Sequence, residues 1–437
     1  MFIENSGHKA EDLLVAVLSV LEFFYLDLAD CRSQSYDNAN NVSGIYSSLQ
    51  ARIHEINHLA EHAPCAAHSM NLVGVHAVEC APEAASFFNT VQTLYNFFTA
   101  STHRWEVLQS HTEKRIALKS LSATRWAARY EAVQALNQHF VEIIETLIIL
   151  EEDIEENAIT RQEAKGIRIQ LERLETAFMQ ILWHFLLSRF NAVSQRLQKI
   201  DCSIADVIDD YHTLIKVVAD TRNEFEIYEK NALKISEIQD YKTTVSRQRK
   251  RKLYADETRD GDVQLSGRDQ FRVNTFNVIL DNLGSELRKR CTAYEKIQEK
   301  FSVIIEFGDL DNREIRKRAK RLREIYCSDL ESSLEDEFVH LHAHCTEKKM
   351  EKNSPSDLLK LLHSNDLYTE FPNVEIAYRI FITLAVTNCS AERSFSCLKR
   401  VKNYLRSTIG ANRLNSLAIL CIESDVLQRL DCEDLID

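Results

Sequence analysis

The sequence predicts a mostly α-helical protein, and two observations lead to this fold class. The 437 residues include only 9 Gly and 4 Pro, about 3% together against a usual share of about 12%. An all-β sandwich or barrel needs frequent turns, which are usually written with Gly, Pro, Asn or Asp. Between residues 83 and 300, by contrast, apolar residues recur at helical spacing over long stretches. We therefore expect two or three mostly helical units.

Charge and cysteine content narrow the class of protein. The formal net charge of −13 gives no overall positive field that would draw the chain onto nucleic acid or an anionic membrane. The eleven cysteines are scattered without CxxC pairs, which is typical of free thiols in a reducing compartment. The longest apolar stretch, Leu13 to Leu26, is interrupted by Glu22 and is too short to cross a bilayer. We expect an intracellular protein with no membrane partner.

The first 80 residues carry mixed signals. Apolar residues recur at helical spacing from Ala10 to Tyr25, which predicts a helix. The segment Cys31–Tyr36 is an extended candidate that ends in a polar cluster suited to a turn. The segment Cys65–Val73 is small and apolar, and its periodicity fits either a strand or the start of a buried helix.

The rest of the chain is dominated by helical patterns. They extend over residues 87–99, 127–152, 164–199, 204–245 and 271–299. Two further helices, at 374–386 and 414–430, flank a short segment at 389–406. Residues 246–267 and 347–356 are polar and resemble exposed connectors.

Four short strings occur in a fixed order along the chain. They are SYDNANNVSG at 35–44, CAAHSMNL at 65–72, LSATRW at 121–126 and NCSAERSFS at 388–396. In this order they resemble the hAT superfamily of DNA transposases, and residues 391–423 resemble its C-terminal dimerisation region. The resemblance implies a partial RNase H-like α/β core at 1–80, a large all-α insertion at 81–370 and a dimerisation region at 371–437.

The resemblance also implies a triad of Asp, Asp and Glu that binds two divalent metals. Such chemistry suits Mg²⁺, which prefers carboxylate oxygens. Asp37 matches the second Asp of the family and Glu392 its Glu, and we expect the two carboxylates to lie within about 12 Å of each other. The first Asp belongs on a strand well upstream, and Asp27 and Asp30 are too close to Asp37 to supply it. We therefore expect the first strands and the first catalytic Asp to be missing, and Mg²⁺ to bind only if a third carboxylate is supplied.

Two residue pairs resemble nucleic-acid contacts of the family. Cys65 and His68 match its CxxH, and Arg125 with Trp126 matches its Arg-Trp pair. A tryptophan of this kind can stack on an unpaired base, which is worth about 1–3 kcal/mol. The alternatives are a buried segment of small residues and a tryptophan that belongs to the core.

Several histidines are candidate ligands for a second type of metal site, a zinc site. A structural zinc needs four ligands, and the CxxH supplies only two. Three histidines at i, i+4 and i+8 could complete a site if they share one helix face, although packed or solvated histidines are the alternative: His54, His58 and His62. A second set has the spacing i, i+2 and i+4, which would bring side chains together on a strand, but the surrounding residues have a helical pattern: His340, His342, His344 and Cys345.

Two basic clusters suggest nuclear localisation or phosphate contacts. The first is in an expected loop: Arg247, Arg249, Lys250, Arg251 and Lys252. The second is on an expected helix, where neighbouring acids could simply balance it: Arg313, Arg316, Lys317, Arg318, Lys320, Arg321 and Arg323.

Together these features predict a nuclear, transposase-derived protein that dimerises through its C-terminal region, contacts DNA as a second partner, needs no cofactor and is catalytically incomplete. One alternative is a metal-dependent transposase or nuclease that uses Asp37, Glu392 and a third carboxylate. Another is a helical scaffold for other proteins without DNA contact, which the net charge of −13 favours.

Overall fold

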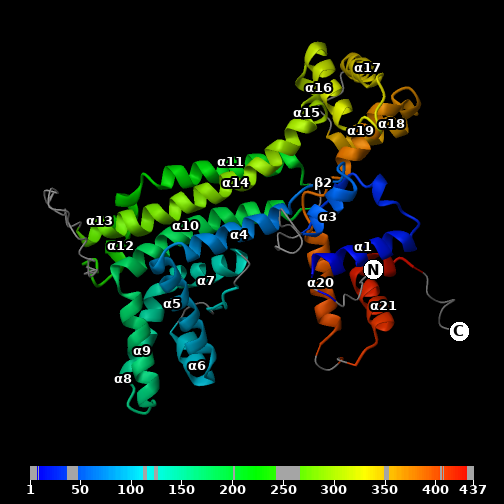
Figure 1. Ribbon diagram of the computed structural model, residues 1–437. Helices are drawn as coiled ribbons and strands as arrows, with labels where there is room; N and C mark the ends of the chain where they lie inside the picture. The colour runs from blue at the N-terminus through cyan, green and yellow to red at the C-terminus, as the bar shows by residue number, and fades with distance from the viewer. Residues whose placement is uncertain are drawn as a thin grey trace, which may run out of the picture. The chain divides into compact units, whose positions relative to one another are not determined.

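A computed structural model describes the chain at residues 7, 9–36, 48–111, 116–122, 126–199, 202–242, 266–348, 354–403, 406 and 408–430. The chain divides into two compact units. Unit 1 comprises residues 1–69, 197–208 and 292–437, and unit 2 comprises residues 70–196 and 209–291. Helices α4 (Ala66–Glu79), α11 (Ile204–Thr221) and α14 (Val278–Lys300) have residues in both units, as does α10 (Leu174–Leu197) through its last residue (Figure 1). Within the described residues, no helix combines the length and hydropathy that a membrane span requires.

The N-terminal part of unit 1 is a small mixed assembly. Helix α1 (Ala10–Phe23) is followed by the 3₁₀ turn η1 (Leu28–Asp30) and strand β1 (Ser33–Gln34). Helix α3 (Leu49–Ile56) and strand β2 (Glu61–His62) come next. One face of α1 packs on Leu49 and Ile53 of α3. The buried Asn57 fixes the turn η1, because its side-chain amide donates to the carbonyls of Leu28 at 2.8 Å and Cys31 at 2.7 Å.

The remainder of unit 1 is helical. Its elements are α15 (Ser302–Ile305), η3 (Phe307–Asp309), α16 (Asn312–Ile325), α17 (Leu334–Glu347), α18 (Pro355–Ser364), η4 (Leu367–Thr369), α19 (Pro372–Ile382), α20 (Cys389–Val401), α21 (Ala411–Ile422) and α22 (Ser424–Leu427). Local signals set the starts of several helices: Asp311 accepts a hydrogen bond from the amide of Glu314 at α16, and Pro355 occupies the first turn of α18. Aromatic rings bridge these helices, with Phe301 packing on both Tyr326 and Phe381.

Unit 2 is a helical bundle. It contains α5 (Pro82–Thr99), α6 (Thr102–Ser110), α7 (Trp126–Gln138), α8 (Phe140–Glu152), α9 (Ala158–Leu171), α10 (Leu174–Leu197), α12 (Phe225–Ile235), α13 (Gly267–Phe271) and the π-helical turn η2 (Arg272–Asn277). Phe178 of α10 lies at the centre of an aromatic cluster that includes Phe225, Phe271 and Phe276. Trp183 is fully buried and packs edge-on against Phe88.

The structure confirms the mostly α-helical fold class. The helix expected from Ala10 extends to Phe23, and the expected strand Cys31–Tyr36 is reduced to two residues. The segment after Cys65 is helical, which answers the question that its periodicity left open. The RNase H-like core stays a prediction, since the described residues contain one sheet of two short strands. The division at 1–80, 81–370 and 371–437 also stays a prediction, and the compact units place residues 292–370 with the N-terminal segment.

A buried carboxylate holds α19 in place within unit 1. Glu337 of α17 is 8% exposed. It accepts hydrogen bonds from the backbone amides of Asn373 at 2.8 Å and Val374 at 3.1 Å, at the start of α19. The Asn373 side chain and the Ser333 hydroxyl donate to the same carboxylate at 2.6 and 2.8 Å. A negative charge at a helix N-terminus satisfies amides that have no partner within the helix.

Replacing Glu337 with Ala is expected to destabilise the protein by about 3 kcal/mol, because it removes charged hydrogen bonds and leaves buried donors unpaired. Urea unfolding followed by circular dichroism measures the change. Glu347→Ala, on an exposed position of the same helix, is the control and is expected to have little effect. An equal loss in the two variants would contradict the assignment.

Candidate functional site

A short parallel ladder brings the segment before Asp37 next to Cys65. Strands β1 and β2 pair in parallel, with Ser33 opposite Glu61. The ladder continues beyond the strands, because the amide of Ala63 donates to the carbonyl of Gln34 at 3.0 Å and that of Cys65 to Tyr36 at 3.4 Å. Tyr36 is the residue immediately before Asp37.

Cys65 also joins this ladder to the start of α20. The amide of Ala66 donates to the carbonyl of Val386 at 2.9 Å. The amide of Asn388 donates to the Cys65 sulfur at 3.3 Å. Three segments that are far apart in the sequence therefore meet at Cys65: the end of β1, the start of α4 and the start of α20. We call these contacts the Cys65 junction.

Glu392 lies in the first turn of α20 and is exposed. Asp37 is outside the described residues, so the expected approach of the two carboxylates stays a prediction. Asp27 accepts a hydrogen bond from the amide of Ala29 at the turn η1 and does not lie on a strand. Cys389, three residues before Glu392 in the same helix, offers sulfur, whereas Mg²⁺ prefers oxygen. The Mg²⁺ site stays a prediction.

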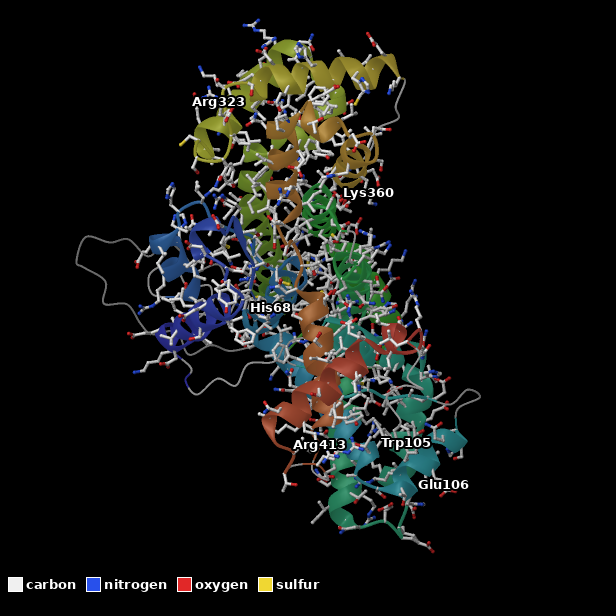
Figure 2. All side chains as sticks on the ribbon, turned by 90° about the vertical axis from the view of Figure 1, so that its right-hand side faces the viewer. His68, Trp105, Glu106, Arg323, Lys360 and Arg413 are labelled. Atoms are coloured by element: carbon white, nitrogen blue, oxygen red, sulfur yellow. The ribbon has the colours of Figure 1, made fainter. Side chains whose placement is uncertain are left out.

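The Cys65-x-x-His68 string forms the first turn of α4. Cys65 is buried, and His68, which Figure 2 labels, is half-buried. The zinc site that combined this string with His54, His58 and His62 on one helix face is wrong, because α3 ends at Ile56. Only His54 is in that helix, whereas His62 lies on β2.

His62 and Tyr36 form a half-buried aromatic pair beside the junction, and the sequence analysis did not single out this pair. Their rings stack at 6.2 Å with an interplanar angle of 23°. Burial lowers the pKa of His62 to about 4 and raises the pKa of Tyr36 to about 12. Both side chains are therefore neutral at physiological pH. The signal that could have pointed to Tyr36 is its position two residues after Gln34 in an extended segment, which places both side chains on one face of the strand.

The His62 pKa predicts a pH dependence of stability. In the unfolded chain His62 takes up a proton near pH 6.5, whereas in the folded chain it does so near pH 4. Folding stability therefore falls as pH falls from 6.5 to 4, by roughly 2 kcal/mol from this group. His62→Phe keeps an aromatic ring on Tyr36 and is expected to lose less melting temperature between pH 7 and pH 4.5 than the unsubstituted protein. His54→Gln, at an exposed position, is the control and should follow the unsubstituted protein; identical profiles for all three would contradict the prediction.

Trp126 is a core residue of unit 2 in this structure. Its side chain is 2% exposed. The indole nitrogen donates to the carbonyl of Met70 at 2.6 Å, and the ring packs on Phe190 with centroids 4.7 Å apart. The expected stacking on a base stays a prediction and would require the indole to leave this site. Arg125 is outside the described residues.

Gly74 of α4 provides space for this indole. A Cβ atom added there would lie 2.5 Å from two ring carbons of Trp126. Gly74→Ala is therefore expected to destabilise the protein by about 1–3 kcal/mol, because the packed ring must shift. Gly166→Ala in α9 is the matched control. Nothing lies within 4 Å of its added Cβ, so this variant is expected to gain about 0.5–1 kcal/mol from helix propensity. Thermal unfolding of both variants tests the contrast, and a stabilised Gly74→Ala would contradict it.

Most basic side chains of α16 form ion pairs within unit 1. The pairs are Arg316–Asp336, Lys317–Glu314, Arg318–Glu306, Arg321–Glu299 and Arg323–Glu335 (Figure 2 labels Arg323). This supports a helix face balanced by acids. The cluster at Arg247–Lys252 is outside the described residues, and its localisation role stays a prediction.

The histidines of α17 are on a helix and not on a strand. Helix α17 spans Leu334–Glu347, so positions i and i+2 do not share one face, and within the described residues no three of these side chains converge on a metal position. The strand-like arrangement of His340, His342, His344 and Cys345 that would favour a metal site is therefore not found.

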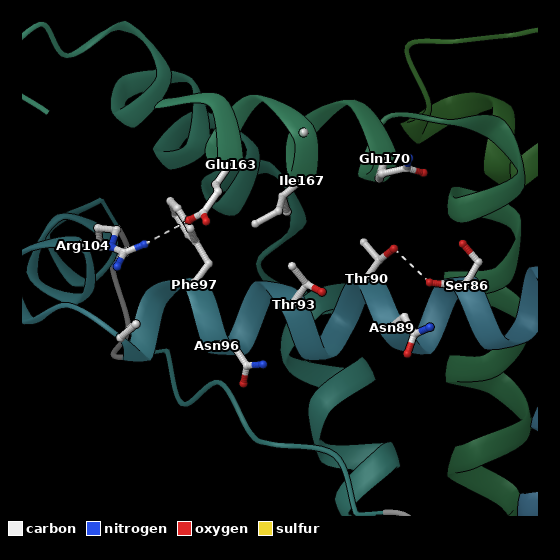
Figure 3. A pocket seen from close by; sticks show the side chains of 12 residues that line it. Ser86, Asn89, Thr90, Thr93, Asn96, Phe97, Arg104, Glu163, Ile167 and Gln170 are labelled. Carbon is white, nitrogen blue, oxygen red and sulfur yellow. Dashed lines mark hydrogen bonds and ion pairs between the residues drawn. The ribbon is translucent and has the colours of Figure 1, made fainter. Parts of the chain in front are cut away.

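Unit 2 has a polar groove between α5 and α9 (Figure 3). Its volume is about 730 Å³. The charged residues among those that line it are Arg104 and Glu163, and the Arg104 Nη1 and Glu163 Oε2 atoms are 3.9 Å apart. The other polar lining residues are Ser, Thr, Asn and Gln, and none of the lining side chains is a thiol or an imidazole. This set provides mostly neutral hydrogen-bonding groups, with one carboxylate that already pairs with Arg104.

The C-terminal helices α20 and α21 pack as a hairpin that buries little of itself (Figure 1). In α20, α21 and α22 the buried residues are Cys389, Cys397, Val401 and Ala418. Several large apolar side chains are instead 36–59% exposed: Ile419, Leu420, Val426, Leu427 and Leu430. Ile419 and Leu420 lie on neighbouring positions of α21, Val426 and Leu427 lie on α22, and Leu430 follows α22. We call this set the C-terminal apolar stripe.

Residues 340–426 match the hAT family C-terminal dimerisation region. The match covers about a fifth of the chain. It begins within α17, upstream of the expected start at 371, and includes Glu392 and most of the C-terminal apolar stripe. The finding supports the expected self-association of this region.

Proposed function

We propose that this chain derives from a hAT transposase and acts as a nuclear protein that pairs with a second copy of itself. The sequence strings also resemble domesticated members of that superfamily, such as zinc finger MYM-type protein 1 and the 52 kDa repressor of the inhibitor of the protein kinase. The observation that carries the proposal is the C-terminal apolar stripe, which lies in a segment that matches a dimerisation region.

The stripe is too apolar for a helix that faces water alone. Complete burial of a leucine or valine side chain is worth about 1.5–3 kcal/mol relative to exposure. Five apolar side chains that are between a third and three fifths exposed would therefore contribute several kcal/mol of stabilisation if a partner surface buried them. A second copy offers the same stripe, and a two-fold interface is self-complementary.

Charges on the stripe are expected to separate the copies without unfolding them. Leu420→Asp combined with Leu427→Asp places two carboxylates on surface that is already partly exposed in one chain. Light scattering should give twice the chain mass for the unsubstituted protein at micromolar concentration and the monomer mass for the variant, with unchanged circular dichroism. Ser416→Asp, at an exposed polar position of α21, is the control and should remain dimeric. A monomeric unsubstituted chain would overturn the proposal.

We also propose that the chain as printed does not catalyse DNA cleavage or transfer. The argument rests on the sequence strings, in which Asp37 and Glu392 match two of the three family carboxylates, and on Asp27, which accepts a hydrogen bond at the turn η1 and does not lie on a strand. Two aligned carboxylates without the third leave a pair of Mg²⁺ ions, about 4 Å apart in phosphoryl transfer, with too few oxygen ligands. A segment that precedes this chain and supplies a strand with an Asp would restore the enzyme alternative.

Incubation of the purified chain with Mg²⁺ and linear or hairpin DNA is expected to give no strand cleavage. Gel electrophoresis of end-labelled DNA measures it. Mg²⁺-dependent cleavage that is lost in Glu392→Gln but kept in Glu423→Gln, an exposed carboxylate outside the junction, would overturn this part of the proposal.

DNA contact is a second, weaker part of the proposed function. The net charge of −13 opposes binding to a polyanion, and most cations of α16 already have acidic partners. We therefore assign any phosphate contact to the cluster Arg247–Lys252. A helical scaffold without DNA contact is the alternative that the charge favours.

A further inference from the structure

Helix α1 and the turn that follows it expose an apolar patch. The face of α1 that packs on α3 is formed by Leu13, Leu14, Val17 and Leu21. Val15 and Leu18 lie outside that contact and are 60% and 37% exposed. Four consecutive residues at the end of the helix are 52–97% exposed: Phe23, Phe24, Tyr25 and Leu26. We call Val15, Leu18 and residues 23–26 the α1 patch, and exposed apolar surface of this kind marks an interaction site.

Tyr25 has a backbone conformation that disfavours a large side chain. Its φ of 56° is in the left-handed region, which glycine adopts readily and tyrosine rarely. Packing within the described chain does not compensate, because Tyr25 is almost fully exposed. Tyrosine is enriched among the residues that contribute most to protein–protein binding. A partner surface that buries the ring would explain a tyrosine at this position.

The segment that carries the α1 patch is acidic. Residues 10–31 include no Lys or Arg and five exposed carboxylates: Glu11, Asp12, Glu22, Asp27 and Asp30. Glu11 and Glu22 share a face of α1 with Val15 and Leu18, because successive members of this set are three or four residues apart. Acidic and apolar side chains are therefore on one surface.

The C-terminal hairpin has the opposite charge. Residues 393–422 include no Asp or Glu and six exposed cations: Arg393, Lys399, Arg400, Lys402, Arg406 and Arg413. The whole chain has a net charge of −13, so the residues outside this +6 segment total −19. Among the described residues, no ion pair includes any of the six cations or of the five acids near α1. We call residues 393–422 the basic hairpin segment, and the C-terminal apolar stripe begins within it, at Ile419.

These charges determine which surface of a second copy suits the stripe. Contact of the stripe with its own counterpart would bring the six cations of each copy close to those of the other, and like charges oppose such a contact. The α1 patch instead offers apolar surface together with acids. Opposite potentials across an interface favour encounter and fix its register.

We propose that the C-terminal apolar stripe of one copy docks on the α1 patch of a second copy, with the basic hairpin segment facing Glu11 and Glu22. In a two-fold dimer this contact forms twice, because each copy provides both surfaces. The inference rests on the proposed self-association and names the surface that receives the stripe. The exposed rings of residues 23–25 form the apolar centre of the contact, and the charged side chains form its rim.

Charge reversal on either surface tests the proposal. Glu11→Lys combined with Glu22→Lys is the α1 variant, and Arg393→Glu combined with Arg413→Glu is the hairpin variant. Analytical ultracentrifugation is expected to give a dimer dissociation constant at least about tenfold higher for each variant, with unchanged circular dichroism. The control, Glu106→Lys combined with Glu237→Lys, makes the same change in net charge as the α1 variant at exposed positions of unit 2. It should dimerise like the unsubstituted chain.

An equimolar mixture of the two variants separates this docking from the alternatives. In a mixed dimer both contacts again join opposite charges, so the mixture should recover the dissociation constant of the unsubstituted chain. A mixture that stays monomeric would overturn the proposal. An α1 variant that dimerises as tightly as the unsubstituted chain would overturn the docking on α1 and leave the proposed self-association in place. A monomeric unsubstituted chain would overturn both.

A further variant tests the contact without a change of charge. Tyr25→Gly fits the left-handed backbone and removes the exposed ring, so the chain should fold as before and dimerise at least about tenfold more weakly. Ile154→Gly is the control, because it removes an exposed apolar side chain from a turn of unit 2. Equal dissociation constants for these two variants would overturn the docking of the stripe on the α1 patch.

Discussion

The hydrogen bonds at Cys65 determine which distant parts of the sequence meet in unit 1. Its backbone amide continues the parallel ladder to Tyr36, and its sulfur accepts from Asn388 at the start of α20. Without these bonds, a strand pair of two residues each would have little to hold it, since short isolated strands are marginal in water. The small side chains of Ala66 and Ala67, both buried, allow the three segments to approach closely.

A second constraint fixes the path of the chain into this junction. Glu337 binds the first amides of α19, and α19 ends only a few residues before Val386 and Asn388. At the other end of the ladder, Arg32 forms a bidentate ion pair with Asp329, in which Nη2 donates to Oδ1 at 2.6 Å and Nε donates to Oδ2 at 2.7 Å. Charged hydrogen bonds of this kind are shorter and stronger than neutral ones. Both contacts join residues on either side of the junction to the loop and helix that follow α16.

The sequence predicted what depends on local pattern and missed what depends on distant partners. Low Gly and Pro content and helical spacing predicted the helices, and the CxxH and the string around Glu392 pointed to segments that do meet. The role of Glu337 was not predictable, because its partners lie 36 residues further along the chain. The charge balance of α16 depends on acids such as Glu299 and Glu335 on other helices. The role of Trp126 was ambiguous, because an indole can stack on a nucleic-acid base or pack on a core ring such as Phe190, and the sequence does not distinguish the two.

The C-terminal hairpin connects the junction with the proposed dimer interface. Helix α20 is held at its first turn by Cys65 and Val386, whereas α21 contributes only Ala418 to the buried residues of the described chain. A helix of 12 residues is marginal by itself in water. The stability of α21 must therefore come from α20 on one side and from whatever covers the C-terminal apolar stripe on the other. Under the proposed function, association stabilises the hairpin by mass action.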